Sequence, residues 1–203
     1  MTLRRRQREA AIEAILESAA GVFAEHGYHG ASMEEVARAS GCAPATLYGY
    51  FKGKQPLFAR MCSDLIAGFG EGAAAAILGG ATYQQAFEQF VDFFITFGEE
   101  NAALIQVFIS LHQNPETGAA PDPEQASQAR QAYLGLVSSL MQRGIDDGEL
   151  MDANPRDLAV CFLGLMHTAA VNIQLDGSQE PLRPVVTFAV DMFRRGAARK
   201  TDP

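Results

Sequence analysis

Apolar residues recur at steps of three and four along most of this 203-residue chain. In residues 9–25 they fall on one side of a helical wheel, and the glutamates fall on the other. The apolar positions of this segment are Ile12, Ile15, Leu16, Ala19 and Phe23. Strand signals, such as an alternating run of β-branched residues or an Asn-Gly hairpin, are scarce. The pattern predicts an all-α fold.

Glycines, prolines and one serine divide the first sixty residues into short helices. Gly27 is expected to end the first helix, where a positive φ is wanted. Ser32, followed three residues later by a glutamate, has the spacing of a capping box and opens a short helix that ends at Gly41. Pro44 suits the first turn of a third helix, and Pro56 that of a fourth.

The rest of the chain alternates apolar helical stretches with segments rich in proline, glycine and aspartate. The predicted helices cover residues 83–97, 102–111, 125–145, 157–174 and 182–195. Residues 114–124 contain three prolines and a glycine and are expected to form a loop. The sequence GFGEG at 68–72 is expected to mark a weak or bent point in the fourth helix.

Composition excludes several classes of protein. No run of about 18 apolar residues lacks a charge or a break, so no membrane span is expected. The N-terminal segment has basic residues but no apolar region, which argues against a signal peptide. The cysteines at 42, 62 and 161 lack CxxC spacing, which predicts a cytoplasmic protein with neither a disulfide framework nor a zinc site.

The charge is unevenly distributed. The net charge is −8, yet residues 1–60 hold eight basic and six acidic side chains, which leaves eight basic and 18 acidic side chains for the remainder. Such asymmetry indicates a polyanion-binding end on an acidic body. Chance scatter of surface charge accounts for it equally well on charge alone.

Two short helices joined by ASGCAP form a candidate helix-turn-helix. Small residues in the second helix would let its backbone approach a DNA groove: Ala43, Pro44, Ala45 and Gly49. Hydroxyls and cations there can reach phosphates: Thr46, Tyr48, Tyr50, Lys52 and Lys54. Leu47 and Phe51, four residues apart, are expected to point inward. The alternative is an aromatic core helix that ends in a basic turn.

The order and spacing of these motifs resemble one protein family. AAGVFAEHGYHGAS, MEEVARASGCAPATLYGYF and KGKQPLF, within residues 9–60, resemble the DNA-binding region of the tetracycline-repressor (TetR) family of bacterial transcription regulators. The resemblance implies a three-helix, helix-turn-helix DNA-binding domain at 1–55. It also implies a larger helical ligand-binding and dimerisation domain at 56–203.

The resemblance assigns roles at the DNA. It implies contacts from Ser32, Ala43, Pro44, Ala45, Thr46, Tyr48, Gly49, Tyr50, Lys52 and Lys54. Ala43, Pro44 and Gly49 stand where the family often has polar side chains, so few groups remain to read base edges, and the operator sequence cannot be read from the helix. The arginines within residues 4–8 can enter a minor groove as an arm, or form a solvated tail.

The resemblance also implies a homodimer formed through the last two helices and an apolar effector pocket in the body. Gly164, Ala169 and Ala170 would permit close helix approach across the dimer axis, whereas packing within a monomer core is the alternative. The candidate effector contacts, each of which can also be plain core, are Phe90, Phe94, Phe97, Phe108, His112, Met166, His167 and Asn172.

Together these features predict a cytoplasmic DNA-binding transcription regulator. We expect a repressor that binds a palindromic operator in double-stranded DNA as a dimer and is released by a small, largely apolar ligand. No catalytic motif is found in the sequence, so neither enzyme activity nor a cofactor or metal is expected. The alternatives are an enzyme, and a helical adaptor or orphan regulator with no ligand response.

Overall fold

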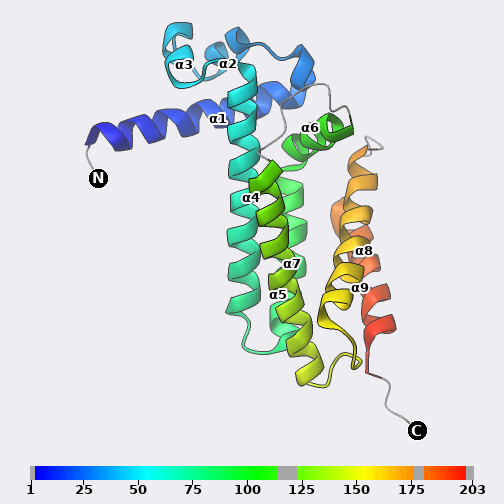
Figure 1. Cartoon of the computed structure of the whole chain (residues 1–203). Coiled ribbons are helices and arrows are strands. Elements are labelled where there is room, and N and C mark those ends of the chain that lie inside the picture. Colours follow the sequence, from blue (N-terminus) through cyan, green and yellow to red (C-terminus); the bar gives the residue numbers. More distant parts are fainter. Residues whose placement is uncertain (1–2, 114–122, 176–180, 200–203) are drawn as a thin grey trace. The chain divides into compact units, whose positions relative to one another are not determined.

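The computed structural model describes residues 3–113, 123–175 and 181–199, and these residues are almost entirely helical (Figure 1). The helices are α1 (Leu3–Gly30), α2 (Met33–Ala39), α3 (Pro44–Tyr50), α4 (Lys54–Gly79), α5 (Tyr83–Glu100), α6 (Ala102–Gln113), α7 (Pro123–Asp146), α8 (Pro155–Leu175) and α9 (Leu182–Ala197). A single β-bridge joins Leu150 to Ala198. The all-α prediction is confirmed. Most of the predicted loop at 114–124 lies outside the described residues.

Packing divides the chain into two units. The N-terminal unit comprises residues 1–65 and 102–123, and the C-terminal unit comprises residues 66–101 and 124–203. Helix α4 therefore begins in one unit and ends in the other, and α6 groups with α1 rather than with the body. The boundary expected after residue 55 places all of α4 and α6 in the larger domain, so it differs from this division.

The N-terminal unit is built around Phe23 of α1. Its ring stacks on Tyr28, with centroids 5.9 Å apart, and meets Phe58 of α4 edge to face at 5.2 Å. Residues from α2, α3 and α6 complete this core: Met33, Val36, Ala37, Leu47 and Val107. Gly27 interrupts α1 with a φ of 66°, as its position in the sequence predicted.

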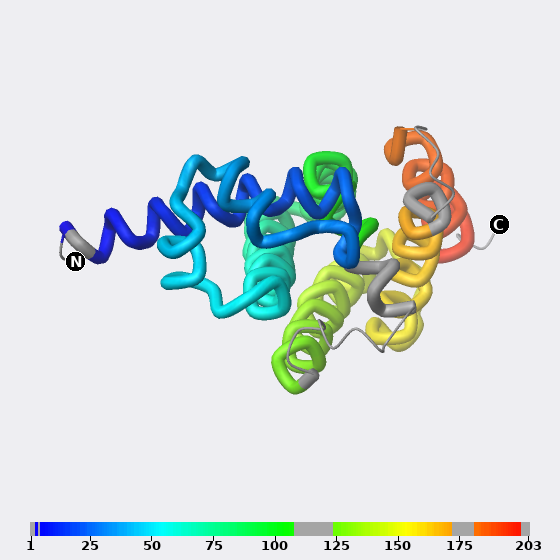
Figure 2. The backbone as a smooth tube through the Cα atoms, turned by 90° about the horizontal axis from the view of Figure 1, so that it is seen from above, coloured from blue at the N-terminus to red at the C-terminus, as the bar shows by residue number. Residues whose placement is uncertain are grey.

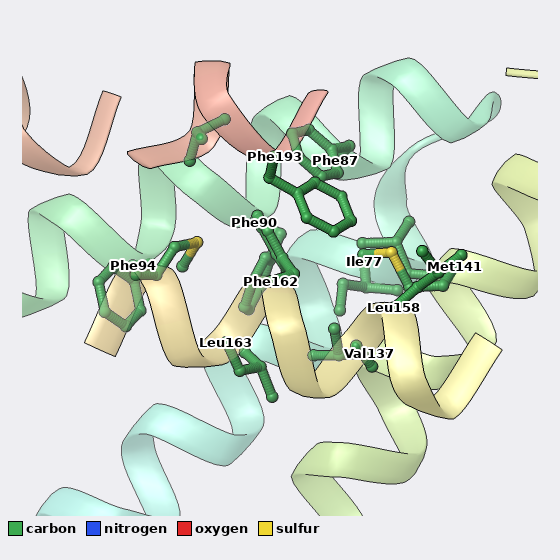
Figure 3. Close-up of a cluster of buried hydrophobic side chains, with 14 of the residues drawn as sticks. Ile77, Phe87, Phe90, Phe94, Val137, Met141, Leu158, Phe162, Leu163 and Phe193 are labelled. Atoms are coloured by element: carbon green, nitrogen blue, oxygen red, sulfur yellow. The ribbon is translucent and has the colours of Figure 1, made fainter. Parts of the chain in front are cut away.

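The C-terminal unit is built around Phe162 of α8. Its ring centroid lies 4.9 Å from that of Phe87 on α5 and 4.9 Å from that of Phe193 on α9. Figure 3 shows these three side chains gathered in one hydrophobic cluster. Helices α8 and α9 run side by side, as Figures 1 and 2 both show. Phe162 of α8 thus packs against both α5 and α9, and its contact with Phe193 helps to hold α8 against α9.

The glycines at 68–72 do not break α4, which continues as helix through this segment. A Cβ atom on Gly72 would overlap the ring of Phe93 on α5. The weak or bent point that these glycines predict is therefore not a break in the helix. At Gly72, the missing side chain makes room for an aromatic ring from the neighbouring helix.

Among the described helices, α4 alone is long and apolar enough to span a membrane by length and composition. The sequence prediction did not anticipate this property. The same helix supplies Leu57, Phe58 and Met61 to one hydrophobic core and Ala73 and Ile77 to the other. We therefore interpret its apolar character as core packing.

Candidate functional site

A capping box fixes the start of α2. The Ser32 hydroxyl oxygen accepts a hydrogen bond from the Glu35 N–H at 3.2 Å, and Glu35 Oε2 accepts from the Ser32 N–H at 2.9 Å and from the Ser32 hydroxyl at 2.7 Å. The hydrogen bond from the Ser32 side chain is the main reason why the pKa of Glu35 lies below its usual value. The predicted cap is confirmed, but both donors of Ser32 are used by Glu35. Ser32 is therefore a capping residue with no free donor for a phosphate.

The turn between α2 and α3 sets the direction of α3. Gly41 follows α2 with a φ of 68°, and Pro44 occupies the first turn of α3. Leu47 is fully buried and Phe51 is 8% exposed, so both anchor α3 as predicted. One face of α3 is thereby fixed inward, and the opposite face is left to solvent.

That opposite face carries most of the residues predicted to contact DNA. Ala43, Pro44, Ala45, Thr46, Tyr48, Gly49 and Lys52 are exposed, and Tyr50 is half-buried. Lys52 Nζ donates to the Tyr48 carbonyl at 3.3 Å, which holds the ammonium beside the C-terminal end of α3. The predicted small residues and phosphate-binding groups are thus open to solvent. We call the exposed part of this segment the α3 face: Ala43, Pro44, Ala45, Thr46, Tyr48, Gly49 and Lys52.

Lys54 has a different place from the one predicted. Its Nζ donates to the His29 carbonyl at 3.1 Å and to the Ala31 carbonyl at 2.9 Å, and it lies 4.9 Å from the Tyr28 ring centroid. An ammonium group has three donors. Two of them join the start of α4 to the last turn of α1 and to Ala31, which gives Lys54 a structural contact. Its contact with DNA stays a prediction.

The arginines near the N-terminus lie in the first turns of α1, which begins at Leu3. Arg5 forms an ion pair with Glu9 at 3.0 Å, and the Arg8 guanidinium lies 6.0 Å from the Tyr50 ring centroid. Helix-forming residues and this i,i+4 pair favour helix over an extended chain. The segment is therefore helical rather than a disordered tail, and its entry into a minor groove stays a prediction.

Comparison with known proteins agrees with this geometry. The family model for bacterial regulatory proteins of the tetR family matches residues 15–61, which include α2, α3 and the start of α4. The N-terminal region of this chain belongs to the TetR family. The match covers the buried anchors of α3 and the whole α3 face described above.

Relatives of this TetR-family regulator extend the likeness into the body. The fatty acid metabolism regulator protein of Bacillus subtilis is 24% identical over 140 residues, which are 68% of this chain and 70% of that protein. Two solved structures share the fold. The TetR-family regulator PfmR from Thermus thermophilus has a TM-score of 0.70 at 20% identity, over 89% of this chain and 97% of its own. FadR from B. subtilis in complex with stearoyl-CoA has a TM-score of 0.72 at 20% identity, over 91% and 98%.

Helices α8 and α9 expose large apolar side chains. Val160 and Leu165 on α8 are 51% and 37% exposed, and Phe188 and Met192 on α9 are 66% and 53% exposed. We call these four residues the α8–α9 face. Of the small residues predicted to allow close helix approach, Gly164 is exposed, Ala169 is half-buried and Ala170 packs inside the unit.

The predicted effector residues have different environments. Phe90, Phe94 and Met166 are buried in the core, and Phe97 is half-buried. His167 is exposed, although its ring stacks on that of Phe94 at 5.4 Å. The side chains of Phe108, His112 and Asn172 lie outside the described residues.

Two residues that the sequence did not single out connect this region. The Phe69 ring on α4 lies 5.1 Å from that of Tyr133 on α7 and 5.3 Å from that of Phe97. The Tyr133 ring in turn stacks on His167 at 5.9 Å. We define the aromatic cluster as Phe69, Phe93, Phe94, Phe97, Tyr133 and His167. A lone tyrosine in the mixed sequence RQAYLGL gave no local signal of this role.

Burial changes the chemistry of both polar members of the cluster. It raises the pKa of Tyr133 and lowers the pKa of His167, because it disfavours the charged form of each. Although His167 is exposed as a residue, its ring packs against those of Phe94 and Tyr133, which shields the imidazole in part. At neutral pH the phenol keeps its proton and the imidazole is uncharged. The cluster therefore offers hydrogen-bonding groups without charge.

Proposed function

We propose that this regulator is a repressor that binds a palindromic operator as a homodimer and is released by a largely apolar effector. The observation that carries the proposal is the α3 face. It presents small residues, hydroxyls and Lys52 on a helix that Leu47 and Phe51 hold from behind. A second helix of this kind lies in the major groove in helix-turn-helix proteins.

Each part of the α3 face suits a different part of a DNA duplex. Tyr48 and Lys52 supply donors for phosphate oxygens, which give affinity and register. Thr46 supplies a hydroxyl and a methyl group for base edges, while Ala45 and Gly49 let the helix backbone approach closely. Because few side chains can read bases directly, we propose that DNA shape contributes to the choice of operator.

The exposed apolar residues of α8 and α9 support the homodimer. Single exposed apolar residues are normal on a soluble protein, whereas a group of large ones marks an interaction site. A two-fold dimer joins the same surface of both copies, so one patch covers its own equivalent. Such a dimer would present two α3 faces to the two halves of a palindrome.

The comparisons suggest the class of effector. A relative is named for the regulation of fatty acid metabolism, and the FadR structure contains stearoyl-CoA. The aromatic cluster supplies apolar surface that suits a long acyl chain. We therefore propose a fatty-acyl effector that stabilises a dimer unable to bind the operator, which requires a higher affinity for that state.

Selection of duplexes from a random pool by the full-length protein tests this function. We expect a palindromic consensus, and we expect stearoyl-CoA, but not CoA alone, to lower the affinity for it. No enrichment over random DNA would contradict the DNA-binding part and favour a helical adaptor. Enrichment without release would contradict the effector part and indicate an orphan regulator.

A further inference from the structure

The aromatic cluster contains a buried hydrogen-bond donor without an acceptor. The Tyr133 hydroxyl is shielded from solvent and has no hydrogen-bond partner among the described residues. Its ring is enclosed by Phe69, Phe90 and His167, with centroids 5.1, 6.1 and 5.9 Å away. Buried polar groups in proteins are nearly always paired, so an unpaired one calls for a partner outside the described residues, such as a water or a ligand.

His167 gives this donor a polar neighbour at the edge of the cluster. Its ring stacks on Phe94 and Tyr133, with an interplanar angle of 25° to each. The side chain is nevertheless exposed to solvent. The aromatic cluster therefore reaches the surface at His167, next to the ring that carries the buried hydroxyl.

The surroundings of these two groups are uncharged. No charged side chain is buried in the part of the chain that the structure describes. Burial raises the pKa of Tyr133 and lowers the pKa of His167. The cation nearest to Tyr133 along α7, Arg130, is exposed. A buried carboxylate needs a paired cation, whereas a neutral carbonyl oxygen needs only a donor.

We propose that the Tyr133 hydroxyl donates a hydrogen bond to the uncharged carbonyl oxygen of an acyl thioester or ester effector. The hydrocarbon chain of the effector would pack against the phenylalanines of the aromatic cluster, and His167 would hold the Tyr133 ring by stacking. Tyr133 thereby selects an acyl thioester over the free fatty acid. This inference rests on the effector part of the proposed function.

A cycle of two ligands and two proteins isolates this one hydrogen bond. The ligands are stearoyl-CoA and S-octadecyl-CoA, a thioether that lacks only the carbonyl oxygen. The proteins are the full-length wild type and Tyr133→Phe, which lacks only the hydroxyl. Tyr83→Phe is the matched control, because the Tyr83 hydroxyl is also buried and unpaired among the described residues but lies outside the aromatic cluster.

We expect the wild type and Tyr83→Phe to bind the thioester about 10-fold more tightly than the thioether, and Tyr133→Phe to bind both equally. We also expect stearate to bind the wild type more weakly than stearoyl-CoA does. The thioester-to-thioether ratio of the wild type needs no substituted protein, so it remains informative if a variant does not fold.

Three results would overturn the inference: equal affinity of the wild type for thioester and thioether, an unchanged ratio in Tyr133→Phe, or tighter binding of stearate. In each case the effector part of the proposed function stands, because an acyl ligand still binds. Failure of the wild type to bind any of these ligands, with operator binding intact, would overturn both this inference and the effector part of the proposed function.

Discussion

The ammonium group of Lys54 lies 4.9 Å from the centroid of the Tyr28 ring, and it donates to the carbonyl oxygens of His29 and Ala31. The two hydrogen bonds join residues that are 25 and 23 positions apart in the sequence. They fix the start of α4 to the last turn of α1 and to Ala31, and so they support the core on which α3 is anchored.

We predict that Lys54→Met lowers the stability of the N-terminal unit by about 1–2 kcal/mol, because it removes two charge-assisted hydrogen bonds and a cation–π contact. Hydrogen exchange of the amides in α1 and α2 of the full-length protein measures this loss. Lys52→Met is the control, since Lys52 is exposed and bonds only to the Tyr48 carbonyl at 3.3 Å. Equal protection in the two variants would refute a structural role for Lys54.

The capping box makes the stability of α2 sensitive to acid. The folded-state pKa of Glu35 lies below its ordinary value of 4.5, chiefly because the Ser32 side chain donates to the carboxylate. Its contribution is therefore present above that value and is lost as the pH falls through the folded pKa. Glu35→Gln keeps an acceptor but cannot titrate.

We predict that wild type and Glu35→Gln differ in unfolding free energy near neutral pH, and that the difference shrinks as the pH falls below 4.5 and through the folded-state pKa of Glu35. Urea unfolding at a series of pH values measures the difference. A constant difference across the series would show that the carboxylate is not coupled to folding. Ser32→Ala is expected to cost about 1 kcal/mol through loss of the cap.

The two buried hydroxyls of Tyr83 and Tyr133 yield an unusual stability prediction. Neither has a hydrogen-bond partner among the described residues, so each is buried at a cost. We predict that Tyr83→Phe and Tyr133→Phe leave the ligand-free protein at least as stable as the wild type, with a gain of up to about 1 kcal/mol. Thermal and urea unfolding measure this. A loss above about 1 kcal/mol in either variant would mean that its hydroxyl is hydrogen-bonded in solution.

The α8–α9 face predicts the oligomeric state. Phe188 is 66% exposed in one chain, and a second copy that covers it would make a charge there costly. We predict that Phe188→Glu raises the dimer dissociation constant more than about 10-fold in sedimentation equilibrium. Leu78→Glu is the matched control, because Leu78 is 76% exposed and belongs to α4 rather than to α8 or α9. A dimer that survives Phe188→Glu unchanged would place the interface elsewhere.

Local patterns in the sequence predicted most of the helices. Leu47 and Phe51 were assigned to the interior because residues four apart share one side of a helix, and both are buried. Gly41 was expected to end α2, and its φ of 68° is a conformation that glycine adopts more readily than other residues do. Spacing alone suffices for features of this kind, since the cause lies within a few residues.

Features that depend on distant contacts could not be predicted in this way. The edge-to-face contact between the Phe69 and Tyr133 rings joins α4 to α7, and nothing near either residue in the sequence indicates the other. The glycines at 68–72 were expected to mark a weak or bent point because glycine weakens helices locally, but nothing in the sequence indicates that Phe93 of α5 packs against Gly72. Lys54 was assigned to DNA because its local context is basic, whereas its hydrogen-bond partners lie far back in the chain.

The central claim is that the α3 face binds DNA. Tyr48 is 40% exposed there, and Lys52 is exposed at the end of the same helix. Tyr48→Phe removes one hydroxyl donor and Lys52→Gln removes one cation, while neither residue belongs to the buried core. Arg156→Gln, which removes an exposed cation from the first turn of α8, is the control for net charge.

The most direct measurement is the affinity of the wild type and these three variants for the selected operator over a series of salt concentrations. We predict that Tyr48→Phe and Lys52→Gln each weaken binding about 10-fold, that Lys52→Gln also reduces the salt slope by about 1, and that Arg156→Gln changes neither quantity. Wild-type affinity and salt slope in both Tyr48→Phe and Lys52→Gln would contradict the claim.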